Sequence, residues 1–307
     1  MATPPPIPPP YGTLGDIQIA MVVATWLFGI VTLQTFNYYR DFANDRTIMR
    51  ALVGGIWLLE LGYTIACWHA MYLVTVSFYG QPEHIFAPPI SMVFPIFFNA
   101  LIAIGVQTFF VYRVWVVSKQ WHIPVLCCAM NIVRLGFNML VFAKLWQNPI
   151  FSRLNTELNW PIIVGSAIGP AVDMIVATSL IFTLWHQRRT GVKRTSRIID
   201  DIIIWTVETT LLTTMTGVMQ LVLFLARRND LSWLVFFLIQ GKLFSNTLLA
   251  SLNGRKRFRE SARDPNMVTF SGHTGNAAVD TLVRMHQMSQ NPYEDPLRPH
   301  GKDAEFT

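Results

Sequence analysis

The chain has 307 residues, of which 52% are hydrophobic and only 14% are charged. A soluble domain carries about 25% charged residues, so this composition excludes an ordinary soluble globular protein. The net charge of +6 could suggest nucleic acid, but the Lys and Arg residues stand in short runs between apolar stretches. They form no continuous basic face, and nucleic acid is therefore not expected as a partner.

Seven apolar segments are each long enough to cross a bilayer, which takes about 20 mostly apolar residues in a helix. They cover residues 17–39, 51–76, 91–117, 122–145, 160–185, 202–226 and 231–252. We therefore predict an all-α fold, a polytopic membrane protein with a seven-transmembrane-helix bundle over residues 17–253. Residues 1–16 are expected to form a Pro-rich extracellular tail, and the polar residues 254–307 a cytosolic and largely disordered tail.

The Lys and Arg residues between the segments are distributed unevenly, fifteen on one side of the predicted bundle and four on the other. The fifteen are Arg40, Arg46, Arg50, Arg113, Lys119, Arg188, Arg189, Lys193, Arg194, Arg197, Arg255, Lys256, Arg257, Arg259 and Arg263, and the four are Lys144, Arg153, Arg227 and Arg228. Membrane proteins concentrate these residues in their cytoplasmic connections. The asymmetry predicts an N-terminus outside and a C-terminus in the cytosol, in the plasma membrane or an endomembrane.

A basic run follows the last apolar segment and consists of Arg255, Lys256, Arg257 and Arg259. Each basic residue near an anionic membrane surface contributes about 1 kcal/mol of attraction. We therefore expect this run to contact anionic lipid of the inner leaflet. Besides the bilayer itself, the remaining partner considered is a small apolar ligand.

The candidate site residues are five ionisable residues inside the apolar segments, together with Asn246. Glu60, Arg134, Asp173 and Lys242 lie near mid-depth by residue count, and Glu208 lies nearer the cytosolic end of its segment. A charge in a membrane interior costs several kcal/mol unless it is paired or hydrated, so such residues mark functional sites. We expect the three carboxylates to face the bundle interior and at least one of them to pair with one of the two cations.

Polar residues repeat at helical spacing in four of the segments, which indicates that these helices face a shared interior. The stripes are Asn131, Arg134 and Asn138; Ser166, Gly169 and Asp173; Thr209, Thr213, Thr216 and Gln220; and Lys242, Ser245, Asn246, Leu249 and Asn253. Hydrogen bonding between packed helices explains the Ser and Asn positions at least as well as a binding site does. The mid-depth charges favour function, because an apolar side chain would pack there without the cost of desolvation.

Motifs for phosphate binding, metal binding and nucleophilic catalysis are missing. The sequence has no Gly-rich phosphate loop, no metal-type Cys/His spacing and no nucleophile elbow. No cofactor and no metal are therefore expected, and catalytic residues are left unassigned. The three cysteines fall inside apolar segments, which argues against a disulfide framework.

Three stretches carry a resemblance: RRTGVKRTSRIIDDIIIWTVETTLLTT (188–214), KLFSNTLLASLNGRKRFR (242–259) and VQTFFVYRVW (106–115). They closely resemble a large family of fungal seven-helix membrane proteins known as domain of unknown function 6534. The resemblance covers about residues 12–260 and implies a fold and a membrane location but no activity. The family's recurrent positions correspond here to Asp173, Thr195, Glu208, Thr209, Leu212, Lys242, Asn246 and Asn253.

Three classes of function fit these observations. A receptor-like or sensory protein is suggested by analogy with other seven-helix architectures. An intramembrane enzyme, comparable with small membrane-bound terpene cyclases, would use Glu60, Asp173 or Glu208 as a general acid, kept protonated by burial. A transporter would use the same groups. Pairing with a buried cation would keep the acids ionised, so the receptor-like interpretation ranks first, the enzyme second and the transporter third.

Overall fold

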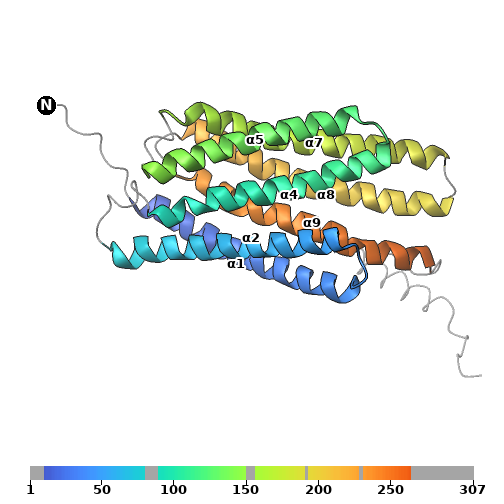
Figure 1. The fold of residues 1–307 in the computed structure, drawn as a ribbon, viewed down its shortest axis with the longest axis horizontal. Coiled ribbons are helices and arrows are strands. Elements are labelled where there is room, and N and C mark those ends of the chain that lie inside the picture. Colours follow the sequence, from blue (N-terminus) through green and yellow to red (C-terminus); the bar gives the residue numbers. More distant parts are fainter. Residues whose placement is uncertain (1–9, 80–88, 150–155, 191–192, 228–230, 264–307) are drawn as a thin grey trace, which may run out of the picture. The chain divides into compact units, whose positions relative to one another are not determined.

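The computed structural model describes residues 10–79, 89–149, 156–190, 193–227 and 231–263. In these ranges the chain is helical without strands, and seven helices are long and apolar enough to cross a membrane. They lie side by side, as Figure 1 shows. Nearly all described residues belong to one compact unit that ends at Ala262. The predicted all-α seven-helix bundle is confirmed.

The spanning helices match the seven predicted segments in order. They are α1 (Pro10–Asp41), α2 (Thr47–Tyr72), α4 (Phe94–Ser118), α5 (His122–Gln147), α7 (Asn159–Thr190), α8 (Lys193–Ala226) and α9 (Trp233–Arg263). A π-helical turn, η1 (Leu73–Ser77), extends α2, and a 3-10 turn, η2 (Ile90–Met92), precedes α4. Consecutive helices pack together from α1 to α8, and α4 also contacts α7.

Two helix ends differ from the predicted domain boundaries. Helix α1 begins at Pro10, inside the predicted N-terminal tail, because proline is well accommodated in a first helical turn, where its missing N–H is not needed. Helix α9 continues to Arg263, beyond residue 253, since the charged residues that follow the apolar span are good helix formers.

Proline and glycine shape the contact between α7 and α8. Pro170 lies inside α7, where its ring cannot donate the helical hydrogen bond. A Cβ added to Gly217 of α8 would lie 2.7 Å from the Pro170 ring and 2.9 Å from the Gln240 amide nitrogen. Glycine at this position therefore lets α7, α8 and α9 approach one another closely.

Helix α9 is the most enclosed of the seven helices, with 61% of its span buried against 22–44% for the others. Two of its asparagines join it to α1: Asn246 Nδ2 donates to the Leu27 carbonyl at 3.2 Å, and Asn253 Nδ2 donates to the Gln34 carbonyl at 2.9 Å. The two donors are seven residues apart in α9, and the two acceptors are seven residues apart in α1. The two helices therefore run parallel and in register. Asn246, one of the candidate residues, thus serves in helix packing.

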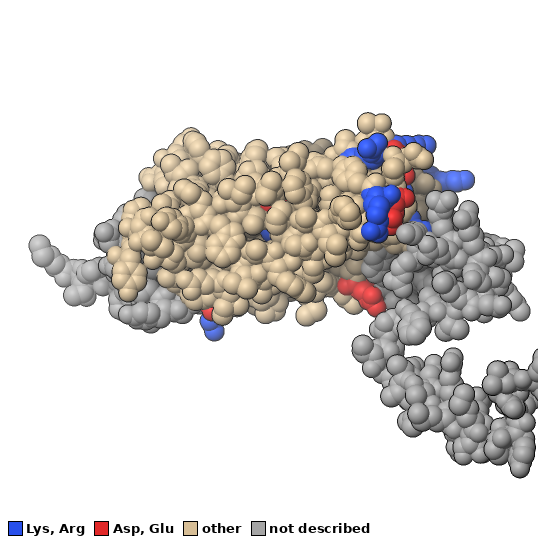
Figure 2. Space-filling view, turned by 90° about the horizontal axis from the view of Figure 1, so that it is seen from below, with Lys and Arg blue, Asp and Glu red and all other residues tan. Residues whose placement is uncertain are grey.

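The outside of the bundle is apolar. Large side chains that are more than 60% exposed include Trp26, Ile48, Ile132, Phe182 and Met215. On the face in Figure 2 the charged side chains gather mainly at the end of the bundle where α9 ends, and most of the surface between the ends carries none. Such a surface would aggregate in water and suits contact with lipid. The chain is an integral membrane protein.

Candidate functional site

Glu60 of α2 and Lys242 of α9 form a buried ion pair. Lys242 Nζ lies 2.5 Å from Glu60 Oε2, and the two side chains are 1% and 0% exposed. The prediction that at least one buried carboxylate pairs with Arg134 or Lys242 is confirmed by this contact.

The polar atoms of the pair all have partners. Lys242 Nζ also donates to Thr64 Oγ1 at 2.7 Å and to the Glu60 carbonyl at 3.3 Å, and Ser245 Oγ donates to Glu60 Oε1 at 2.6 Å. The ammonium lies 4.4 Å from the centre of the Tyr63 ring, close enough for a cation–π contact. This arrangement gives both charges partners within the protein and joins α2 to α9. The polar atoms of the pair are therefore not available to bind a ligand.

Arg134 of α5 is placed differently, because no described residue forms an ion pair with it. The side chain is only 7% exposed, and its guanidinium lies on Gly169 of α7, where an added Cβ would be 3.0 Å from Arg134 Cζ. The Phe244 ring of α9 lies 5.6 Å away on another side. Among the described residues, Arg134 Nη1 has no hydrogen-bond partner.

Asp173 of α7 is near Arg134 without touching it. The two charges influence each other, but no direct ion pair joins them. Gln107 Nε2 donates to Asp173 Oδ1 at 3.3 Å, while Asp173 Oδ2 is buried without a partner in the described part of the chain. Arg134 and Asp173 could have formed a second buried ion pair, but this pair is not formed in the structure.

Asp173 faces a small polar cavity, here named the C-terminal cavity because it lies toward the end of the bundle where α9 ends. Its volume is about 40 Å³, enough for a few water molecules. Gln107, Arg113, Thr213 and Ser251 also line it, and Arg113 Nη1 donates to Ser251 Oγ at 2.9 Å.

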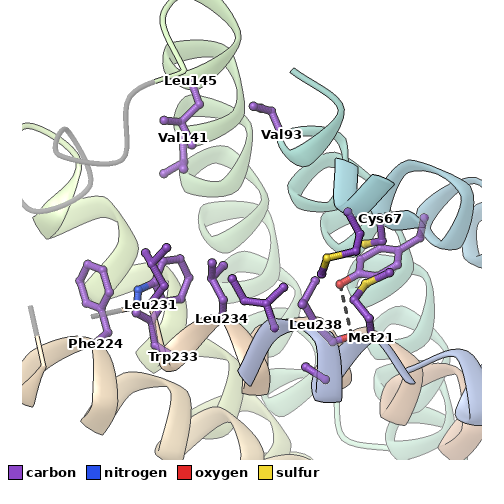
Figure 3. Close-up of a cluster of buried hydrophobic side chains, with 14 of the residues drawn as sticks. Met21, Cys67, Val93, Val141, Leu145, Phe224, Leu231, Trp233, Leu234 and Leu238 are labelled. Atoms are coloured by element: carbon purple, nitrogen blue, oxygen red, sulfur yellow. Dashed lines mark hydrogen bonds between the residues drawn. The ribbon is translucent and has the colours of Figure 1, made fainter. Parts of the chain in front are cut away.

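A larger cavity, the N-terminal cavity, lies at the end of the bundle where α1 begins, and its volume is about 90 Å³. All seven helices contribute to its wall, for example through Leu14, Cys67, Ile96, Val141, Ile162, Gln220 and Leu234. Figure 3 shows the cluster of buried apolar side chains that supplies part of this wall, among them Met21, Val141 and Leu238. The wall is therefore mainly apolar.

Three polar side chains interrupt the apolar wall of the N-terminal cavity: Asn138 of α5, Ser166 of α7 and Gln220 of α8. Gln220 Nε2 donates to Ser166 Oγ at 3.4 Å. Asn138 and Ser166 belong to the predicted polar stripes, so the structure brings the stripes of α5 and α7 together. These residues form the polar floor of the cavity.

The prediction that Glu208 faces the bundle interior is wrong, because its side chain is exposed. Glu208 lies in the half of α8 (Lys193–Ala226) nearer the predicted cytosolic end. An exposed side chain at this position points away from the packed helices, so the carboxylate is not held in the bundle interior. The charged candidate residues that lie in the interior are therefore Glu60, Arg134, Asp173 and Lys242.

Arg255 is part of a contact between the end of α9 and the α1–α2 connection. Its Nη2 donates to Asp45 Oδ2 at 2.6 Å, and the Tyr38 hydroxyl donates to the same oxygen at 2.8 Å. Burial alone would raise the pKa of Asp45, but these hydrogen bonds and the Arg255 charge bring it below its usual value. The expected lipid contact of the basic run stays a prediction, and the side chains of Lys256, Arg257 and Arg259 lie outside the described residues.

Gln107 and Tyr63 take part in the buried polar contacts although neither was predicted as a site residue. Gln107 is 3% exposed and holds Asp173, and Tyr63 is 1% exposed and donates its hydroxyl to the Leu238 carbonyl at 3.2 Å. The sequence does show an amide and a phenol within otherwise apolar stretches, which indicates a buried polar contact. It does not show which neighbour each side chain will contact.

The fold and the buried charges define an integral membrane protein with a seven-helix bundle. Residues 169–257 match a family described as "Family of unknown function (DUF6534)". The chain thus carries this domain of unknown function from α7 to α9, which confirms the resemblance for that segment, while the fungal origin stays a prediction. No curated protein and no solved structure matches the chain.

Proposed function

We propose that the protein is a receptor-like seven-helix membrane protein that binds a small apolar ligand in the N-terminal cavity. In this proposal the N-terminus and the cavity face the outside, and the end of α9 faces the cytosol, as the distribution of Lys and Arg indicates. The observation that carries the proposal is a mainly apolar cavity with a polar floor, walled by every one of the seven helices.

The position of the cavity supports a receptor-like role over simple storage of a ligand. A guest that touches all seven helices can stabilise one relative arrangement of them over another. Ligand sites of this kind are concave and mostly apolar, with a few polar groups that fix orientation. The cavity volume of about 90 Å³ is below that of a roughly 150 Å³ apolar cavity known to hold benzene, so the ligand or the part of it held here is small.

The positions of the carboxylates give less support to the enzyme alternative. Glu60 is paired with Lys242 and lines neither cavity, and Glu208 is exposed. Asp173 faces the smaller, polar cavity. Of the described residues, none of the three proposed general acids borders the apolar cavity in which a hydrocarbon substrate would be held.

The proposal is tested with 1-pentanol as a neutral, short-chain probe. Ala70 lines the N-terminal cavity and Ala66, one helical turn earlier on α2, does not. In purified protein, the probe should raise the unfolding temperature of wild type and of the control Ala66→Leu, but not of Ala70→Leu, in which the added side chain fills the cavity.

The receptor-like part of the proposal needs a second measurement. Binding of 1-pentanol should change amide hydrogen exchange around Asp45 and Arg255, at the opposite end of the bundle. An equal response of Ala70→Leu and Ala66→Leu would contradict the cavity as the binding site. Binding without any change in exchange at the far end would contradict the receptor-like role.

A further inference from the structure

The interior between the two cavities contains polar atoms without partners. Arg134 Nη1, both side-chain heteroatoms of Asn131, and Asp173 Oδ2 are buried without a hydrogen-bond partner among the described residues. An unsatisfied buried donor or acceptor costs about 1–3 kcal/mol, and more when it is charged. A bound polar guest would supply partners to groups of this kind.

Helical spacing places Arg134 directly beneath the polar floor of the N-terminal cavity. On α5, Asn138 lines the cavity and Arg134 lies one turn deeper. On α7, Ser166 lines the cavity and Gly169 lies one turn deeper, with the Arg134 guanidinium against it at 3.0–3.1 Å from the position of a Cβ. A guest in the cavity therefore needs to pass only the floor to reach Arg134.

The chemistry of the guanidinium selects the group that would meet it. Arginine offers only donors, in a planar fork that fits the two oxygens of a carboxylate. Asp173 does not fill this role, because it is held by Gln107 and makes no direct ion pair with Arg134. The Phe244 ring covers another side of the guanidinium without supplying an acceptor.

We infer that the N-terminal cavity binds a short-chain monocarboxylate, with its alkyl chain among the apolar side chains and its carboxylate on Arg134. This inference rests on the proposed function, since it uses the same cavity. The small volume, about 90 Å³, limits the chain to a few carbons. The mainly apolar wall excludes ligands with several charges, because it offers them no partners.

The test compares pentanoate with 1-pentanol at pH 7, where the acid is ionised and the two probes have the same chain length. Wild-type protein should bind pentanoate at least about tenfold more tightly than 1-pentanol, as a charge-assisted hydrogen bond would provide. Arg134→Gln should lower the pentanoate affinity to that of 1-pentanol and leave 1-pentanol binding unchanged. Ala70→Leu should lose both probes.

A second variant keeps the test valid if Arg134→Gln does not fold. Gly169→Ala places a methyl group where the guanidinium lies, so it should weaken pentanoate binding more than 1-pentanol binding. Equal affinity of the two probes for wild type, or equal losses in either variant, would overturn the carboxylate site while leaving the apolar cavity intact. Binding of neither probe to folded wild type would overturn the proposed function and this inference together.

Discussion

Replacing Lys242 by methionine should strongly destabilise the protein. The substitution keeps the length and apolar stem of the side chain but removes the ammonium from a pair that is 1% and 0% exposed. Glu60 would keep the hydrogen bond from Ser245 but lose its counter-ion at a fully buried position. Breaking one partner of a buried pair costs about 3–5 kcal/mol, and we expect Lys242→Met to fall in that range.

The double variant separates the pair from its surroundings. Glu60→Gln should also destabilise, because it leaves the Lys242 ammonium without a counter-ion. Together, Glu60→Gln and Lys242→Met should cost less than the sum of the two single changes by at least about 1 kcal/mol, since neither charge is then left alone. Equilibrium unfolding of the purified proteins in detergent measures the four free energies.

A surface pair provides the control for this cycle. Arg40 and Asp41 form an ion pair in which the side chains are 58% and 21% exposed, and such pairs contribute about 0–1 kcal/mol. Arg40→Met should therefore change stability little. If the costs of Glu60→Gln and Lys242→Met add without coupling, the two charges are solvated independently and our account of the pair is wrong.

Three further outcomes are expected. Wild type should lose its stability advantage over Asp45→Asn as the pH falls below about 4. The reason is that the pKa of Asp45 is lowered in the folded protein, and the ionised form is the one that binds Arg255. Unfolding temperatures between pH 6 and pH 3 would measure this loss. Asn253→Leu should cost about 0.6 kcal/mol, the average for hydrogen bonds between membrane helices, measured by detergent unfolding. Gly217→Ala should lower the unfolding temperature by several degrees, because its Cβ would lie 2.7 Å from Pro170.

Each of these has an outcome that contradicts it. A pH-independent difference between wild type and Asp45→Asn would show that the carboxylate is not favoured by its neighbours in the folded state. An unchanged stability of Asn253→Leu would assign no role to its bond with the Gln34 carbonyl. For the glycine, Gly105→Ala is the matched control, since its Cβ would meet Ile56 at an ordinary 3.7 Å.

The spans could be predicted from the sequence because the cost of placing charge and free backbone groups in lipid acts on each helix separately. Which helices meet could not be predicted, since the packing of one helix against another depends on the whole bundle. The sequence therefore indicated that a carboxylate would meet a cation, but not that Lys242 would meet Glu60 and leave Arg134 without a direct partner.

Which side of a helix faces the interior was predicted correctly for some polar residues and wrongly for others. Glu208 was assigned to the interior, but its side chain is exposed. The polar stripes of α5 and α7 were predicted to face inward, and their members Asn138 and Ser166 do meet at the floor of the N-terminal cavity. The cavity itself could not be foreseen, because empty space depends on side-chain packing across all seven helices.

The most enclosed of the seven described spans is also the last of the seven to be synthesised. Six spans enter the membrane before α9, the helix with 61% of its span buried, is available to them. Until then the Glu60 carboxylate has no ammonium beside it, and the Leu27 carbonyl of α1 lacks its asparagine donor. A chain that stops before Trp233 would thus leave Glu60 without its counter-ion and α1 without this hydrogen bond, so the six preceding spans gain these contacts only when α9 is complete.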